Sequence, residues 1–401
     1  MHFFILALIL LISQQVAHAQ TIPDKKFIKA NSVVFAADGF ANFSGAFRNQ
    51  NAENRAALGN DSQLFLKAGV MTQSKVKYGA VVKTELNINT DGRRENPNFD
   101  QVFFFSESAV GRVEIGNSQS ANQKMKTGPA SFARGAGGIN GKYLENVNLA
   151  SGAFILLAQS PIGHGGYAVG NANFSQKNNF RALKDNSFDG VEDATKISYY
   201  TPRIEGFQIG TSYTPNSQNS GFTATKYYRN AVVPVADILS FGANYAQDFD
   251  NLSVEISATA EEGRVRKTVE ARQNLSAYDM AAKLDYFGFS LGASYGSWGN
   301  SLYGARDIAA KSDYYTLGLA YAFGPIAASI TSLKSQFQKN DYAAISLGLD
   351  YKLAKDLMPY FELTKFNFKS HQAQVSGASS QGSLVQNNHG YVFLTGILIS
   401  F

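Results

Sequence analysis

The sequence has no cysteine, only nine prolines and a single tryptophan, and charged residues make up 17% of its 401 positions. Without cysteine the chain can form no disulfide, thiol nucleophile or cysteine-based metal or haem attachment site. Long hydrophobic runs are also missing, because no segment reaches the roughly 18 apolar residues of a membrane-spanning helix. These absences exclude a disulfide-rich scaffold and a helical membrane protein.

Catalytic and nucleic-acid signals are missing too. The formal net charge is +5, but the basic residues are spread singly along the chain, so no nucleic-acid partner is expected. Histidine is equally sparse, and no Gly-x-Ser-x-Gly motif accompanies it. The histidines are His2, His18, His164, His371 and His389. We therefore expect no enzyme activity, no metal site and no cofactor.

The first residues have the pattern of a secretory signal. A continuous apolar run from Phe3 to Ile12 precedes Ala17-His18-Ala19, a small-x-small cleavage site, although no Lys or Arg stands before the run. The alternative, a membrane anchor, needs a longer run to cross about 30 Å of hydrocarbon. The sequence predicts a signal peptide at 1–19, followed by a periplasmic segment at 20–37.

Alternation of apolar and polar residues is the clearest pattern in the remaining chain. Within residues 78–89 one face is largely apolar, while the other carries Lys83 and Glu85. Successive strand residues point to opposite faces, so this segment predicts a strand with one apolar side.

Gly-x-x-Tyr recurs near strand ends, where tyrosine suits a membrane interface or a cross-strand aromatic pair. The repeats are Gly210/Tyr213, Gly242/Tyr245, Gly292/Tyr295, Gly318/Tyr321 and Gly348/Tyr351.

Connection lengths distinguish a membrane barrel from a soluble sandwich, which alternation alone does not. Short and long connections alternate along the chain, as they do in outer-membrane barrels. The even strand number places both ends of the barrel on the periplasmic side. The predicted architecture is an all-β, 16-stranded antiparallel transmembrane β-barrel over 38–401, with a long third connection at 117–193. The expected strands are 39–48, 62–73, 76–90, 99–107, 110–116, 194–201, 205–214, 237–247, 251–260, 276–286, 287–297, 313–323, 324–334, 341–352, 357–368 and 389–401.

Three stretches resemble the general porins of Gram-negative bacteria, in particular those of alpha-proteobacteria. They are residues 111–117, the hairpin at 196–215 with its Tyr-x-x-Pro-x-x-x-Gly-Phe core, and the apolar end at 390–401. The resemblance covers nearly all of 38–401. It implies an outer-membrane location, a homotrimer and a third loop that folds into the lumen and narrows the pore. It further implies that the terminal strand is recognised by the barrel-assembly machinery. The Pro-Glu-Phe-Gly-Gly-type loop motif of the family is absent.

Candidate functional residues follow from the polar faces and the third loop. Charges facing lipid at the midplane cost about 2–4 kcal/mol, so the charged strand positions are expected to face the lumen. They could merely solvate a wide lumen, or form a cationic wall that sets ion preference. The expected pore-lining residues are Arg48, Lys67, Lys83, Glu85, Arg112 and Glu114, those of the constriction loop are Lys124, Lys126, Arg134, Lys142 and Glu145, and those of the assembly signal are Tyr391, Phe393 and Phe401.

The function that these features predict is a water-filled channel for passive diffusion of ions and small hydrophilic solutes, with a weak preference for anions. Its expected surroundings are outer-membrane lipid and lipopolysaccharide. One alternative is a structural or adhesive surface barrel that its long loop plugs. A second is a secreted soluble β-sandwich that binds a ligand.

Overall fold

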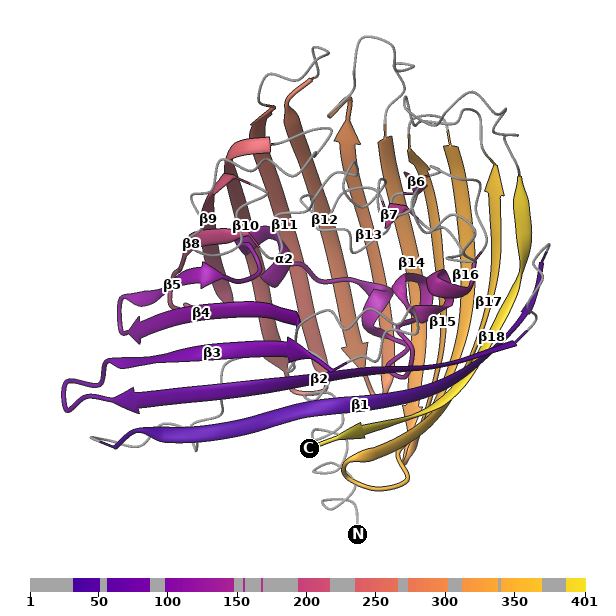
Figure 1. Ribbon diagram of the computed structural model, residues 1–401, viewed down its shortest axis with the longest axis horizontal. Coiled ribbons are helices and arrows are strands. Elements are labelled where there is room, and N and C mark those ends of the chain that lie inside the picture. The colour runs from indigo at the N-terminus through magenta and orange to yellow at the C-terminus, as the bar shows by residue number, and fades with distance from the viewer. Residues whose placement is uncertain are drawn as a thin grey trace.

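The computed structural model describes residues 32–50, 56–86, 98–147, 154–155, 167–168, 194–216, 235–265, 273–301, 312–337, 340–369 and 387–401. Sixteen antiparallel strands close into one barrel, in which each strand pairs with its neighbours along the chain and β1 pairs with β18 (Figure 1). The predicted signal peptide at 1–19 lies outside the described residues. In the described ranges no helix is long and apolar enough to cross a membrane.

All sixteen expected strands are present, with ends shifted by a few residues. The barrel strands are β1 (Val34–Asn49), β2 (Ala56–Met71), β3 (Lys77–Glu85), β4 (Asn98–Ser108), β5 (Gly111–Asn117), β8 (Thr195–Tyr200), β9 (Phe207–Asn216), β10 (Val235–Phe249), β11 (Leu252–Val265), β12 (Leu275–Tyr286), β13 (Phe289–Gly299), β14 (Ser312–Phe323), β15 (Ile326–Phe337), β16 (Asn340–Tyr351), β17 (Leu357–Lys369) and β18 (Asn388–Ser400). Two further short strands, β6 (Phe154–Ile155) and β7 (Tyr167–Ala168), form a separate two-stranded sheet.

The barrel wall begins earlier than expected. Strand β1 starts at Val34 and pairs with β2 from there, so residues 34–37 belong to the barrel and not to a separate segment before it. Alternation extends across this region, since Phe35 is exposed and Asp38 forms an ion pair with Lys67 on the neighbouring strand. The sequence prediction missed this extension because Ala36 and Ala37 carry little contrast between the two faces.

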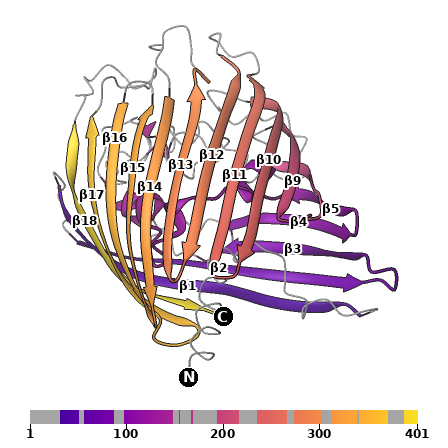
Figure 2. The same ribbon diagram turned by 180° about the vertical axis from the view of Figure 1, so that it is seen from behind.

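Alternation sorts the side chains of the wall as predicted. Outward positions such as Phe43, Leu66 and Ile115 are exposed and apolar, whereas the inward positions Asn42 and Glu114 are buried. Bulges interrupt the pattern locally. One lies between Lys83 and Thr84, where Thr84, expected on the outward face, is buried. Short turns join the strands at the end where β18 finishes (Figure 2). At the opposite end most connections span more residues, but only residues 338–339 separate β15 from β16.

The connection between β5 and β8 enters the barrel. Its described part carries a short helix, α2 (Ala121–Lys124), and three 3-10 turns, η2 (Pro129–Ser131), η3 (Gly138–Asn140) and η4 (Lys142–Asn146). These turns lie within the ring of strands (Figure 1). The segment 118–147 is called the inner loop below.

Candidate functional site

The inner loop follows the inside of the wall through most of the ring. Near its start, the backbone N–H of Ala121 donates to Ser212 Oγ of β9 at 2.8 Å. Further on, the N–H of Thr127 donates to Ser257 Oγ of β11 at 3.0 Å. Near its end, Lys142 pairs with Asp61 of β2 at 2.8 Å. The loop is therefore attached to the wall at several points around the ring.

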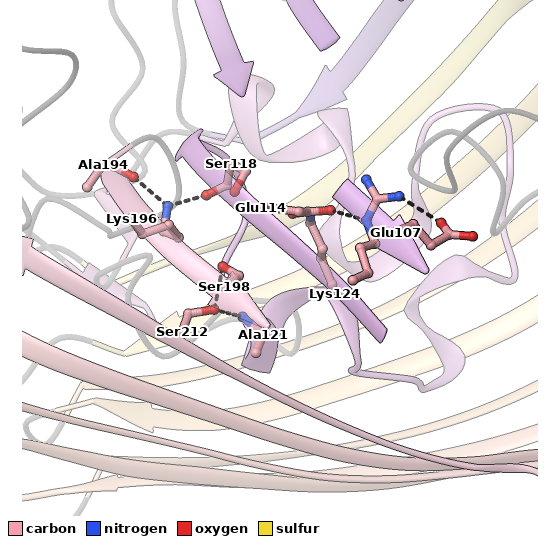
Figure 3. A network of polar contacts seen from close by, with 10 residues as sticks. Glu107, Glu114, Ser118, Ala121, Lys124, Ala194, Lys196, Ser198 and Ser212 are labelled. Atoms are coloured by element: carbon pink, nitrogen blue, oxygen red, sulfur yellow. Dashed lines mark hydrogen bonds and ion pairs between the residues drawn. The ribbon is translucent and has the colours of Figure 1, made fainter. Parts of the chain in front are cut away.

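A buried acid anchors the start of the loop. The carboxylate of Glu114 on β5 pairs with Arg112 at 2.8 Å and with Lys124 of α2 (Figure 3). Arg112 also pairs with Glu107 at 3.1 Å, and Glu107 pairs with Lys77 at 2.8 Å. Together these residues form a chain of alternating charges from the short-turn end of the wall to α2. The two cations satisfy the charge of Glu114, which is only 2% exposed.

Aromatic rings complete the environment of these cations. The Lys124 ammonium lies 4.9 Å from the ring centroid of Phe103 and 5.5 Å from that of Tyr200. The Arg112 guanidinium lies 4.4 Å from the ring centroid of Phe105. Burial lowers the pKa of Lys124, and the neighbouring Glu114 opposes this shift. The ammonium and the guanidinium are thus held in place by both charge and ring contacts.

A second buried anchor lies on β12. Lys126 pairs with Asp279 at 3.2 Å and also donates to the hydroxyl of Tyr314, which in turn donates to Asp279. Burial lowers the pKa of Lys126, and the charge of Asp279 opposes this shift. This basic residue of the loop therefore faces an acid of the wall and is not directed into open solvent.

Two adjacent wall acids hold the middle of the loop through its backbone. Asp350 on β16 accepts from the N–H groups of Arg134 at 3.1 Å and Gly135 at 3.2 Å. Glu362 on β17 accepts from the N–H groups of Ala136 at 2.6 Å and Gly138 at 3.0 Å. Both carboxylates thereby satisfy backbone donors that would otherwise be buried without partners.

Apolar packing holds the last described turns of the loop. Ile139, Tyr143 and Leu144 belong to a buried cluster that includes Tyr342 and Phe366 of the wall. The hydroxyls of Tyr143 and Tyr342 are hydrogen-bonded at 2.7 Å. In this sector the inside of the barrel is a packed core, and any water-filled passage has to run elsewhere in the lumen.

The Gly-x-x-Tyr repeat has a structural role that the sequence analysis did not assign. An offset of three places glycine and tyrosine on opposite faces of a strand. The tyrosines are outward, and the glycines lie under the loop. An added Cβ at Gly242 would lie 2.9 Å from the carbonyl oxygen of Ala121 and 2.9 Å from Met125 Cβ, and one at Gly318 would lie 2.5 Å from Pro129 Cβ. Gly210, Gly292 and Gly348 similarly face Met125, Pro129 or Ala133 of the loop.

Most of the expected pore-lining residues lie on the inward face. Lys67 pairs with Asp38, whereas Arg48 forms no ion pair with any carboxylate that the structure describes. Lys83 lies on the same inward face of β3. The side chains of Glu85 and Glu145 lie outside the described part of the chain.

The four basic loop residues do not face the lumen as free charges. Lys124, Lys126, Arg134 and Lys142 each pair with a wall acid, Arg134 with Asp350 at 3.4 Å. The sequence analysis named Glu114 but missed Asp279 and Asp350, which occupy the polar faces of predicted strands, and Asp61, which stands one residue before one. The partner acids are Glu114, Asp279, Asp350 and Asp61. Within the described ranges no group of three His, Cys, Asp or Glu side chains is placed to hold a metal ion.

The expected assembly residues lie on the outward face of the last strand. Tyr391 and Phe401 are exposed, and the Phe393 ring lies 6.2 Å from that of Phe361. Phe401 also closes the barrel, since its N–H and carbonyl form hydrogen bonds of 3.1 and 3.0 Å with the backbone of Gly39.

Comparisons with known proteins agree with this architecture. A family model described as Gram-negative porin matches residues 6–371. An uncharacterized protein of Rickettsia conorii is 26% identical, with 87% of this chain and 86% of that protein aligned. One from Rickettsia bellii is 29% identical, with 66% and 70% aligned.

Solved structures share the fold at low sequence identity. The anion-selective porin from Comamonas acidovorans superposes with a TM-score of 0.57 at 18% identity, over 92% of this chain and 100% of that one. A mutant of Rh. blastica porin gives a TM-score of 0.51 at 14% identity, with the same shares covered.

Proposed function

Because this chain belongs to the Gram-negative porin family, we propose that its diffusion path runs between the inner loop and strands β1–β4 and weakly favours anions. The protein is an outer-membrane channel for diffusion of small solutes, and it is not an enzyme. The proposal concerns where the solutes pass and which charge the passage prefers.

The observation that carries the proposal is the uneven pairing of charges inside the barrel. The loop cations are offset by wall acids, and the acids Asp350 and Glu362 are occupied by loop backbone. On β1–β5 the cations whose side chains the structure describes are Arg48, Lys67, Lys77, Lys83 and Arg112, and the acids so described are Asp38, Asp61, Glu107 and Glu114. Arg48 has no acidic partner there, and three cations share two acids in the chain that ends at Lys124. Such an excess enriches anions in a narrow lumen, although salt screens it beyond about 8–10 Å.

The related fold of the Comamonas acidovorans porin, which is described as anion-selective, is in line with this proposal. The expected partners are the small hydrophilic solutes and ions themselves, together with outer-membrane lipid and lipopolysaccharide.

The reversal potential across a KCl gradient in a planar bilayer tests the proposal. We expect the wild-type channel to favour chloride slightly, most clearly in dilute salt. Changing Arg48→Gln and Lys83→Gln together should move the potential toward cation preference. The matched control is Lys355→Gln, an exposed lysine in the turn before β17, which should change nothing. Cation preference in the wild type, or an unchanged potential in the double variant, would contradict the proposal.

A second candidate function is a plugged surface barrel. The apolar cluster around Tyr143 and Phe366 favours it, because this cluster fills one sector of the lumen with packed side chains. A plugged barrel would insert and fold normally but conduct no ions.

Two further proposals concern assembly. Small and apolar outward residues, Ala41 and Gly45 on β1 and Ile397 and Ile399 on β18, suit close contact between copies in a homotrimer. Native mass spectrometry of the mildly extracted protein would show three chains, and a monomer would count against the trimer.

The exposed Phe401 suits recognition by the barrel-assembly machinery. Phe401→Ser should lower the amount of heat-modifiable barrel in the outer membrane, and an unchanged amount would refute that role.

A further inference from the structure

Two lysines stand on the outward face of the barrel, where the neighbouring side chains are largely apolar. Lys334 on β15 and Lys365 on β17 are both exposed. They are separated by the single strand β16, which presents Ala343 and the exposed Ile345 beside them. We call Lys334 and Lys365 the outer lysine pair. With strands about 4.8 Å apart, their backbones are about 10 Å apart across the sheet.

The surroundings of the outer lysine pair differ from those of the lysines inside the barrel. Most of the inward lysines described above have a carboxylate partner, such as Asp38 for Lys67 or Asp279 for Lys126. Neither outer lysine forms an ion pair within the described part of the chain. Each lies instead beside an exposed tyrosine ring, Lys334 at 6.0 Å from the centroid of Tyr315 and Lys365 at 5.6 Å from that of Tyr391.

The position along the strands fixes the depth of the pair in the membrane. Both lysines lie in the half of their strand that is farther from the turns before β15 and β17, on the side of the barrel that carries most of the long connections and is external in barrels of this class. Toward the short turns, the same face carries Leu347 and Phe361, both exposed. A lysine costs about 2–4 kcal/mol at the midplane but about 0–1 kcal/mol near the interface, so this depth places the ammonium groups among headgroups.

We propose that the outer lysine pair binds a phosphate-bearing lipid headgroup of the outer leaflet. The two ammonium groups and Lys369 supply the positive charge of this face at headgroup depth, which exceeds that of the acids Asp313 and Asp341 beside them, and Ala343 leaves space between the two lysines. The tyrosine rings position the lysines, while Ile345 and Leu347 below them contact the acyl chains. Free phosphate lacks the chains that this apolar surface would cover, so the headgroup of an inserted lipid is the ligand that fits both parts.

The test uses the full-length protein extracted in mild detergent, with native mass spectrometry to count bound lipid. The probes are diphosphorylated lipid A, its dephosphorylated form and inorganic phosphate. The double variant Lys334→Gln with Lys365→Gln should bind diphosphorylated lipid A about thirty-fold more weakly than wild type, and each single variant about five-fold. The matched control is Lys355→Gln at the opposite rim, which should bind as wild type does.

The remaining measurements distinguish a lipid headgroup from free phosphate and from a second copy of this chain. Dephosphorylated lipid A and inorganic phosphate should both bind weakly to every variant, and added salt should weaken the wild-type interaction. Unchanged binding in the double variant, or equal binding of the dephosphorylated lipid, would overturn the proposal. A loss of chains from the oligomer in the double variant would also overturn it, because the lysines would then contact a second copy. Single-channel conductance should stay at the wild-type value, since both side chains face away from the lumen.

Discussion

At the scale of single residues, the function of this barrel depends on which charges are paired. Alternation alone identified Arg112 and Glu114 as inward, because both stand on the polar face of a short strand. Lys124, the second cation on Glu114, comes from α2, and no local pattern in the sequence joins the two segments. A charge facing the lumen can thus be predicted from strand periodicity, but its partner depends on how the loop folds back.

Glu114→Gln should destabilise the barrel because it leaves Arg112 and Lys124 buried without their shared carboxylate. We expect the free energy of unfolding, measured by urea titration of the barrel in lipid vesicles, to fall by about 3 kcal/mol. The matched variant Glu107→Gln removes a carboxylate that is partly exposed, and it should cost about 1 kcal/mol or less. Equal losses in the two variants would show that Glu114 is an ordinary surface charge and not the anchor of the loop.

At the scale of elements, the inner loop and the wall are fitted to each other. The strands were predictable because each one repeats the same period-two pattern over several residues. The path of the loop was not, because most of its anchors lie on strands far away in sequence. Examples are Ser212, Asp279, Asp350 and Glu362. The Gly-x-x-Tyr repeat was visible in the sequence, but only the loop above Gly242 and Gly318 explains why those positions are glycine.

Gly242→Val should displace α2 toward the open lumen, since even a Cβ would lie 2.9 Å from the backbone of Ala121. We expect the single-channel conductance to fall, with larger current noise than in the wild type. Gly59→Val is the matched control, because a Cβ at Gly59 would meet only Ser44 Oγ at 4.0 Å. If both variants conducted as the wild type does, the loop would not depend on the glycines for its position.

At the scale of the whole molecule, the barrel separates its two surroundings by residue parity. The outward face meets lipid with exposed apolar and aromatic side chains, and the inward face carries the charges and the loop. Strand number and antiparallel order were predicted from the sequence and are confirmed. The predicted alternation of short and long connections fails between β15 and β16, where only residues 338–339 join the two strands. The pairing of the four loop cations changes the origin of the proposed ion preference. It moves the source of that preference from the loop to the wall of β1–β5.

The central claim is that the lumen stays open to water although the loop occupies part of it. Single-channel recording of the purified, heat-modifiable protein in a planar bilayer tests this most directly. We predict discrete, ohmic conductance steps that increase nearly in proportion to KCl concentration, because a barrel of this strand number holds a water-filled channel. Folded barrel that inserts into the bilayer but produces no such steps at any salt concentration would contradict the account and favour the plugged barrel.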